Sequence, residues 1–216
     1  MSTTDDAPAP AAPPTGVADP APLGLAAFAL TTFLLSAVNA GWAKSSTGLD
    51  WWGFAIAYGG LAQLLAGMWE FRNRNVFGAT AFSTYGGFWI GVGLWLHFIA
   101  PTATAPIALN RDLGWILLAF AIFNTYMLII STQVTLAVFG VFLTLEITEI
   151  LLFIGNFTTT KPALPPFAVY NTGLIQAGGY VGVITALVAW YASMAGVMNG
   201  HKGRVVFPVG GTLFKL

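Results

Sequence analysis

Two carboxylates, Glu146 and Glu149, lie three residues apart inside an otherwise apolar stretch. That spacing puts both side chains on one face of a helix. An ionised Asp at the centre of a membrane helix costs about 2.5–3.5 kcal/mol on insertion scales, so lipid favours a protonated form of at least one Glu. The pair is a candidate site for proton coupling. The equal alternative is a protonated pair that only hydrogen-bonds between helices or between subunits.

Other polar side chains recur in the apolar stretches, where each costs free energy unless it faces a partner, a cavity or another subunit. Hydroxyl and amide groups stand beside aromatic residues in five of these stretches, and Lys and Arg are absent from all of them. A single Thr more commonly bonds to its own helix. The collective pattern predicts a narrow, weakly polar pathway for a small solute with one polar end.

The residue inventory argues against an enzyme. The chain has no cysteine, and neither His97 nor His201 has the Glu-x-x-His spacing of a di-iron bundle. The common hydrolase, metalloprotease and nucleotide-binding motifs are also absent from the sequence. We therefore expect no catalytic residues, no metal and no cofactor. Nucleic acid is not an expected partner, because the basic residues fall singly between apolar runs.

The elements that position these residues are predicted to be membrane helices. Of the 216 residues, 56% are hydrophobic and only 7% are charged, against about 25% charged in a typical soluble domain. The apolar runs are too long for membrane strands and do not alternate. The sequence predicts an all-α integral membrane protein in the lipid bilayer, with a six-transmembrane-helix bundle.

Six apolar stretches approach the roughly 20 residues that a helix needs to cross the bilayer. They form one predicted domain, residues 19–200, between a disordered N-terminal tail, 1–18, and a C-terminal tail, 201–216. The predicted inner segments hold five Lys or Arg residues against three in the outer loops, which favours cytoplasmic termini in the plasma (inner) membrane. The predicted helices are 23–43, 51–70, 78–99, 113–131, 134–155 and 171–197.

A proline-rich heptad stands at the start of the first predicted helix. Its carboxylate can cap the helix while the first proline occupies the first turn. The heptad closely resembles the signature Asn-Pro-Ala-Pro-Leu-Gly-Leu of the acetate uptake transporter family (GPR1/FUN34/YaaH), which includes the succinate-acetate permeases. The likeness continues through Tyr58-Gly59-Gly60 and Gly155-Asn156 to about residue 197. The heptad comprises Asp19, Pro20, Ala21, Pro22, Leu23, Gly24 and Leu25.

This resemblance implies six-helix protomers that assemble as a homohexamer. Each protomer would hold its own pathway for acetate or a related short carboxylate such as succinate, either channel-like or coupled to protons. The family's apolar constriction matches Phe28, Tyr85 and Leu143. The positions that would bind the substrate carboxylate match Thr31, Thr84 and Gln63.

Two features depart from the family pattern. Asp19 replaces the usual Asn and adds a negative charge, and the family does not assign a role to Glu146 or Glu149. Two other functions stay open at this point: export of ammonium, which has been suggested for relatives, and a membrane scaffold or sensor without flux. For a transporter, we expect selection by size and by polarity at one end of the solute.

Overall fold

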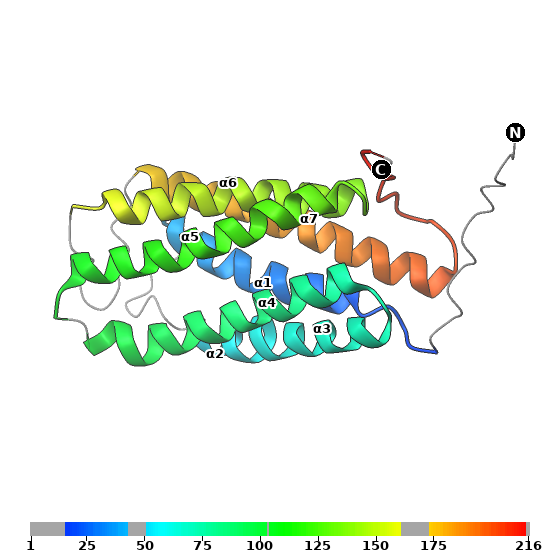
Figure 1. Ribbon diagram of the computed structural model, residues 1–216, viewed down its shortest axis with the longest axis horizontal. Helices are drawn as coiled ribbons and strands as arrows, with labels where there is room; N and C mark the ends of the chain where they lie inside the picture. The colour runs from blue at the N-terminus through cyan, green and yellow to red at the C-terminus, as the bar shows by residue number, and fades with distance from the viewer. Residues whose placement is uncertain (1–15, 43–50, 103, 161–172, 215–216) are drawn as a thin grey trace, which may run out of the picture.

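The computed structural model describes residues 16–42, 51–102, 104–160 and 173–214, and within these ranges every regular element is a helix (Figure 1). Four helices are long and apolar enough to cross a membrane. Each exceeds 18 residues, close to the length that the hydrocarbon core requires. These four are α1 (Ala21–Asn39), α5 (Pro106–Ser131), α6 (Leu136–Thr158) and α7 (Gly173–Lys202).

Two further stretches, residues 52–72 and 76–102, are helical from end to end but change their hydrogen-bonding pattern along the way. Each contains a π-helical segment, a form that is rare as an extended run and frequent near functional sites. The first stretch comprises α2 (Trp52–Phe54), η1 (Ala55–Ala62) and α3 (Gln63–Arg72), and the second comprises α4 (Val76–Leu94), η2 (Trp95–Ile99) and η3 (Ala100–Thr102).

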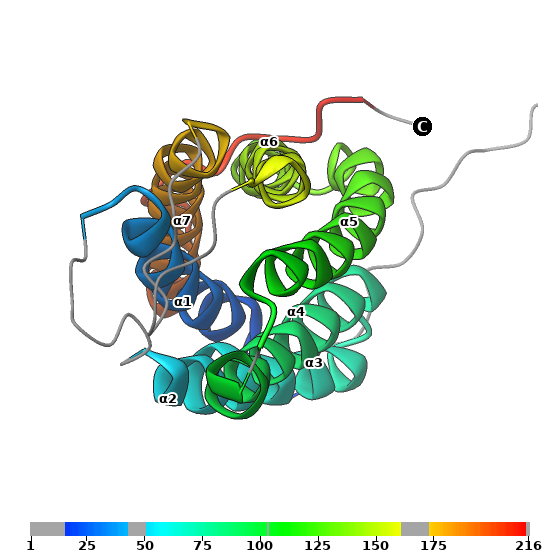
Figure 2. The same cartoon turned by 90° about the vertical axis from the view of Figure 1, so that its left-hand side faces the viewer.

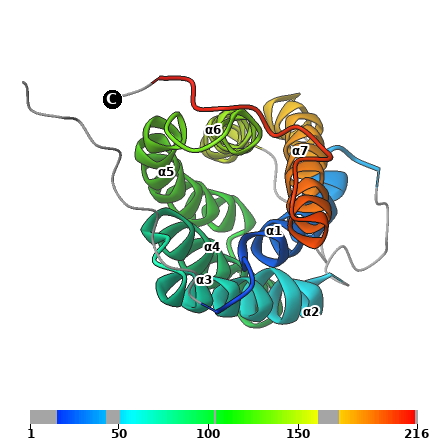
Figure 3. The same ribbon diagram turned by 90° about the vertical axis from the view of Figure 1, so that its right-hand side faces the viewer.

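Seen end-on, α1, α7, α6, α5 and α4 follow one another around a circle, and the α2–α3 stretch packs outside against α1 and α4 (Figure 2, Figure 3). Aromatic side chains join α4 to α5. The Phe88 and Phe120 rings are 4.6 Å apart, and Tyr85 lies 5.5 Å from Phe123, centroid to centroid. Between these two helices, the inner wall of the bundle is therefore built from aromatic rings.

The signature heptad fixes the start of α1. The Asp19 Oδ1 atom accepts a hydrogen bond from the backbone amide of the first helical residue at 3.0 Å, so this carboxylate satisfies one of the free amides at the helix start. Pro22, and not Pro20 as the sequence suggested, lies in the first turn, because Pro20 occupies the N-cap position. The Pro22 carbonyl accepts a hydrogen bond from Ser193 Oγ of α7 at 2.6 Å.

Two glycines allow helices to approach closely. A Cβ atom at Gly24 would lie 2.6 Å from the Phe82 ring of α4, and one at Gly59 would overlap the Thr31 side chain of α1. By contrast, a Cβ at Gly87 would meet no described atom within 4 Å. Close packing at small residues contributes to helix association in lipid, and α1 packs in this way against α4 at Gly24 and against η1 at Gly59.

The boundary of α5 differs from the prediction. The helix begins at Pro106, not at residue 113. Arg111 and Asp112, which mark the predicted break, are both exposed, so these charges reach solvent from within the helix and do not interrupt it. Of the predicted N-terminal tail, residues 1–15 lie outside the described residues.

After α7 the chain turns back over the ends of α5 and α6, and residues 205–214 form what we call the C-terminal strap (Figure 3). Asn199, in the last turns of α7, holds its beginning. The Asn199 Oδ1 atom accepts hydrogen bonds from the amides of Val206 and Phe207, and its Nδ2 donates to the Phe207 carbonyl.

The far part of the strap binds the turn between α5 and α6. The Leu213 amide donates to the Thr132 carbonyl at 2.8 Å, and the Val209 carbonyl accepts from the Ala137 amide at 2.9 Å. Helix ends leave such carbonyls and amides without partners inside the helix. The strap therefore supplies hydrogen bonds that the end of α5 and the start of α6 lack.

Candidate functional site

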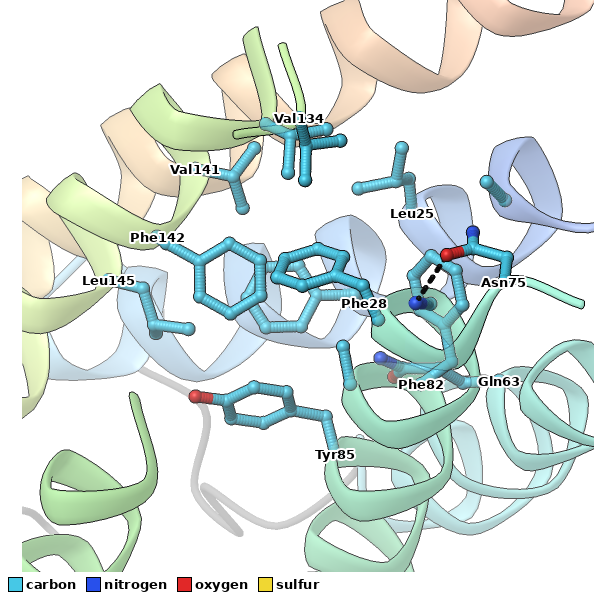
Figure 4. A pocket seen from close by; sticks show the side chains of 15 residues that line it. Leu25, Phe28, Gln63, Asn75, Phe82, Tyr85, Val134, Val141, Phe142 and Leu145 are labelled. Carbon is cyan, nitrogen blue, oxygen red and sulfur yellow. Dashed lines mark hydrogen bonds between the residues drawn. The ribbon is translucent and has the colours of Figure 1, made fainter. Parts of the chain in front are cut away.

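Two cavities lie inside the bundle. The larger, of about 90 Å³, has an apolar lining in which Gln63 and Asn75 are the polar side chains (Figure 4). The smaller, of about 30 Å³, has room for two or three waters at about 10–15 Å³ each. The side chains with polar groups that line the smaller cavity are Thr32, Ser36, Tyr85, Trp89, Thr148 and Glu149.

Phe28, Tyr85 and Leu145 line both cavities. They come from α1, α4 and α6, and along each helix the earlier lining residues face the larger cavity while the later ones face the smaller. All three side chains are buried, and the Phe28 and Tyr85 rings meet edge to face at 5.6 Å (Figure 4). These three residues form an apolar constriction between the two cavities.

The structure does not place Leu143 in this constriction. Leu143 lines neither cavity and is 39% exposed, whereas Leu145 is 6% exposed. Two residues along a helix correspond to a rotation of about 200°, which turns Leu143 to the opposite side. The prediction of Leu143 as the third residue of the constriction was therefore wrong by two positions. Leu145 lies next to Phe28 and Tyr85 instead.

The three expected carboxylate-binding residues lie in three different surroundings. Thr31 is fully buried against Gly59, and its hydroxyl donates to carbonyls of its own helix at 3.1 and 3.2 Å. Thr84 faces a groove of about 440 Å³ between α4 and α5. Gln63 does line the larger cavity, and its buried Oε1 atom has no hydrogen-bond partner among the described residues. Only Gln63 of the three faces the pathway that the two cavities define.

Thr32 is the hydroxyl of α1 that faces this pathway. It lines the smaller cavity, and its buried Oγ1 atom finds no hydrogen-bond partner in the described part of the chain. The sequence marked Thr31 and Thr32 alike, as adjacent polar residues in an apolar helix. Adjacent residues point about 100° apart around a helix, and the Thr31 side chain points toward Gly59 and not into the cavity.

Tyr85 is held by a hydrogen-bond network across α4, α5 and α6. Its hydroxyl donates to Asn124 Oδ1 at 2.9 Å. The Asn124 amide group then donates to the Phe142 carbonyl at 3.0 Å and to Glu146 Oε2 at 2.7 Å. Thr125 Oγ1 lies 2.7 Å from the other Glu146 oxygen. The sequence showed Asn124 only as one of many polar residues, since its contacts come from helices distant in the chain.

The two glutamates share a helix face but differ in surroundings. Glu146 is half-buried, and both of its oxygens have hydrogen-bond partners on α5. Glu149 is buried and lines the smaller cavity. Its Oε1 atom lies 3.4 Å from the Tyr85 hydroxyl, and within the described residues its Oε2 atom has no hydrogen-bond partner. Glu149 is therefore the carboxyl group that faces the pathway.

The arrangement suits a small solute that is apolar at one end and polar at the other. Apolar side chains form the constriction, and hydroxyl, amide and carboxyl groups lie on either side of it. The described residues contain no cluster of three or more His, Cys, Asp or Glu side chains that could hold a metal ion.

Comparison with known proteins gives a consistent result. The GPR1/FUN34/yaaH family pattern matches residues 4–211. The chain is similar to Acetate permease A of Emericella nidulans, with 40% identity over 203 residues, 89% of this chain and 65% of that relative. It thus spans slightly less than two thirds of that relative's length. It is also similar to the succinate-acetate/proton symporter SatP of Escherichia coli K12, with 35% identity over 91% of this chain and 97% of the relative.

A solved structure shares the fold. The chain is similar to the structure of the bacterial acetate channel SatP, with a TM-score of 0.75 and 32% identity, over 90% of this chain and 99% of that one. With its apolar helices, the chain is a multi-pass membrane protein. Since the family match extends over residues 4–211, and a 35% identical relative is covered over 97% of its length, the chain belongs to the GPR1/FUN34/yaaH family.

Proposed function

We propose that this chain is a membrane transport protein, and not an enzyme, that conducts acetate and related short-chain carboxylates through its own bundle, channel-like or coupled to protons. One structural observation carries the proposal: Phe28, Tyr85 and Leu145 form an apolar constriction between two cavities with polar side chains. The names of the relatives, an acetate permease, an acetate channel and a succinate-acetate/proton symporter, support the substrate class.

Acetate fits the chemistry of the constriction. A carboxylic acid of this kind titrates near the ordinary Glu value of about 4.3, so it is an anion at neutral pH. Its methyl group can lie against the three apolar side chains, while Gln63 on one side and Thr32 on the other offer hydrogen bonds. Hydrated inorganic ions would have to lose their water there, which is costly. The constriction therefore selects small solutes that are apolar at one end and polar at the other.

The test is radiolabelled uptake into proteoliposomes with a panel of acids of increasing size. Phe28→Ala should increase the entry of larger acids relative to acetate, because it widens the constriction. Phe54→Ala is a matched control, since Phe54 is 56% exposed and lies outside both cavities. Unchanged flux and discrimination in Phe28→Ala would show that the constriction lies elsewhere. An absence of acetate uptake by the wild type would favour a scaffold or sensor.

We also propose proton coupling through the carboxyl pair on α6. Glu149 faces the smaller cavity, and Glu146 joins the hydrogen-bond network of Asn124 beside it. Replacement of both carboxyl groups by Gln should abolish acetate-driven proton uptake. Proton uptake that persists in the double variant would exclude the pair, and a double variant that fails to fold would favour a structural role.

The proposed assembly is a homohexamer of protomers with six crossings, in the plasma (inner) membrane with cytoplasmic termini. The continuous helical stretches 52–72 and 76–102 supply the two crossings beyond the four apolar helices. Because the sequence has no cysteine, single cysteines can report topology by labelling from each side. Arg74→Cys and Gly203→Cys should react from the cytoplasm and Thr104→Cys from outside. Native mass spectrometry measures the subunit number.

A further inference from the structure

The smaller cavity contains two buried oxygen atoms without hydrogen-bond partners among the described residues, Thr32 Oγ1 and Glu149 Oε2. A buried polar atom that stays unpaired costs about 1–3 kcal/mol. Two such atoms, brought from α1 and α6 to a cavity with room for two or three waters, indicate that a ligand or water completes their hydrogen bonds.

Counting hydrogens shows which protonation state of Glu149 the site accommodates. The Tyr85 hydroxyl has one hydrogen, and its shorter contact is to Asn124, at 2.9 Å against 3.4 Å to Glu149. Both hydrogens of the Asn124 amide group are used by Phe142 and Glu146. No hydrogen in this network is left for Glu149. The donors of Tyr85 and Asn124 are thus committed elsewhere, whereas a protonated Glu149 brings its own donor. That donor joins the Thr32 hydroxyl and the Trp89 Nε1–H, which line the same cavity and have no hydrogen-bond partner among the described residues.

The other described groups around Glu149 are either acidic or uncharged. The titratable groups that face it are the Tyr85 phenol on α4 and the Glu146 carboxyl on its own helix. The remaining polar groups are uncharged: Thr32 and Ser36 on α1, the Trp89 indole N–H on α4, the Asn124 amide on α5, and the Thr185 hydroxyl of α7, which contacts Thr148. Lys and Arg are not among the residues that line the cavity.

Resting on the proposed function, we propose that the smaller cavity is a carboxylate-binding site in which the protonated carboxyl group of Glu149 and the Thr32 hydroxyl donate hydrogen bonds to the substrate carboxylate. The methyl group then lies against Phe28, Tyr85 and Leu145, which line the same cavity. One proton on Glu149 accompanies each bound anion. Because the protonated carboxyl group of Glu149 is neutral, the bound anion meets a hydrogen-bond donor there and not a second buried negative charge, whose burial would be costly.

The experiment measures acetate exchange in proteoliposomes with equal pH on both sides, after subtraction of protein-free liposomes, over a series of pH values. For the wild type, the acetate concentration for half-maximal exchange should rise about tenfold per pH unit once Glu149 has lost its proton. Glu149→Gln, which keeps a neutral hydrogen-bond donor, should bind severalfold more weakly and lose this pH dependence. Asp112→Asn, which replaces an exposed carboxyl group that lines neither cavity, is the control and should keep it.

A second pair of variants tests the hydroxyl. Thr32→Val should raise the acetate concentration for half-maximal exchange by up to about tenfold, because it removes one hydrogen bond to the substrate. Thr31→Val is its control, because Thr31 bonds only to its own helix and lines neither cavity. Infrared spectroscopy of the purified protein supplies a readout independent of transport. The C=O band of a protonated carboxyl group should shift on addition of acetate and be absent in Glu149→Gln.

The outcomes separate this inference from the proposed function. If wild type exchanges acetate but Glu149→Gln keeps the full pH dependence, the neutral acid is the transported species and the inference is overturned. If ligand binding in the smaller cavity becomes tighter as Glu149 loses its proton, and methylammonium competes with acetate, the cavity binds cations and the inference is overturned. If the wild type exchanges no acetate while acetate still shifts the infrared band, binding is real and the transport proposal fails.

Discussion

Replacement of Leu145 by Ala should open the constriction, whereas the same replacement of Leu143 should not. Leu145 is 6% exposed and lines both cavities, while Leu143 is 39% exposed and lines neither. The two residues are identical in type and only two positions apart. The pair therefore isolates the effect of which side of α6 the side chain faces.

The magnitude follows from the size of the side chain removed. One methylene in a well-fitted apolar site changes discrimination by about 10- to 200-fold. Leu145→Ala removes three carbons from the narrowest point between the cavities, so the flux ratio of propionate to acetate should rise at least about tenfold. Burial also predicts a stability cost for Leu145→Ala of about 2–5 kcal/mol, as in other cores. For Leu143→Ala we expect a flux ratio within about twofold of wild type and a smaller stability cost.

The assay is competitive uptake of two differently labelled acids into the same proteoliposomes, which cancels differences in the amount of active protein. Thermal unfolding in detergent, followed by size-exclusion chromatography, reports stability. A change of selectivity in Leu143→Ala together with none in Leu145→Ala would refute the geometry of the constriction. Equal changes in both variants would mean that selectivity is set by the stability of α6 and not by a narrow point.

Three further changes test other parts of the structure. Tyr85→Phe leaves the buried Asn124 Oδ1 atom without its hydrogen-bond donor, and it should lower thermal stability by about 1–3 kcal/mol while keeping size selectivity. Gly59→Ala should greatly reduce the yield of folded protein, because the added methyl group overlaps Thr31, and Gly87→Ala should be tolerated because its Cβ meets no described atom within 4 Å. Asn199→Ala removes three hydrogen bonds to the C-terminal strap, and limited proteolysis should cut the strap faster than in wild type.

The sequence predicted the residues that a motif specifies but not those that depend on helix rotation. The family motif led to Phe28 and Tyr85, and both lie between the cavities. On α6, leucines stand at positions 143 and 145. Leu143 precedes Glu146 by three residues and Leu145 precedes Glu149 by four, so each leucine lies on the same side of the helix as one of the two carboxyl groups. The motif alone could not choose between the two leucines.

The hydrogen-bond network was beyond sequence reasoning for another reason. Asn124 and Glu149 are 25 positions apart, and each contacts Tyr85, which lies on a third helix. The presence of polar residues in lipid indicates that they have partners. Which partners they have depends on how the helices pack, and the aromatic contacts between α4 and α5 are one part of that packing.

The C-terminal strap has a consequence for how the protein is made. During synthesis α5, α6 and the turn between them leave the ribosome well before residues 205–214 exist. Until then the Thr132 carbonyl and the Ala137 amide must be hydrated, because their final partners, Leu213 and Val209, have not been translated. This corner of the bundle is the last to mature, and a translation arrest late in α7 would leave it open to water.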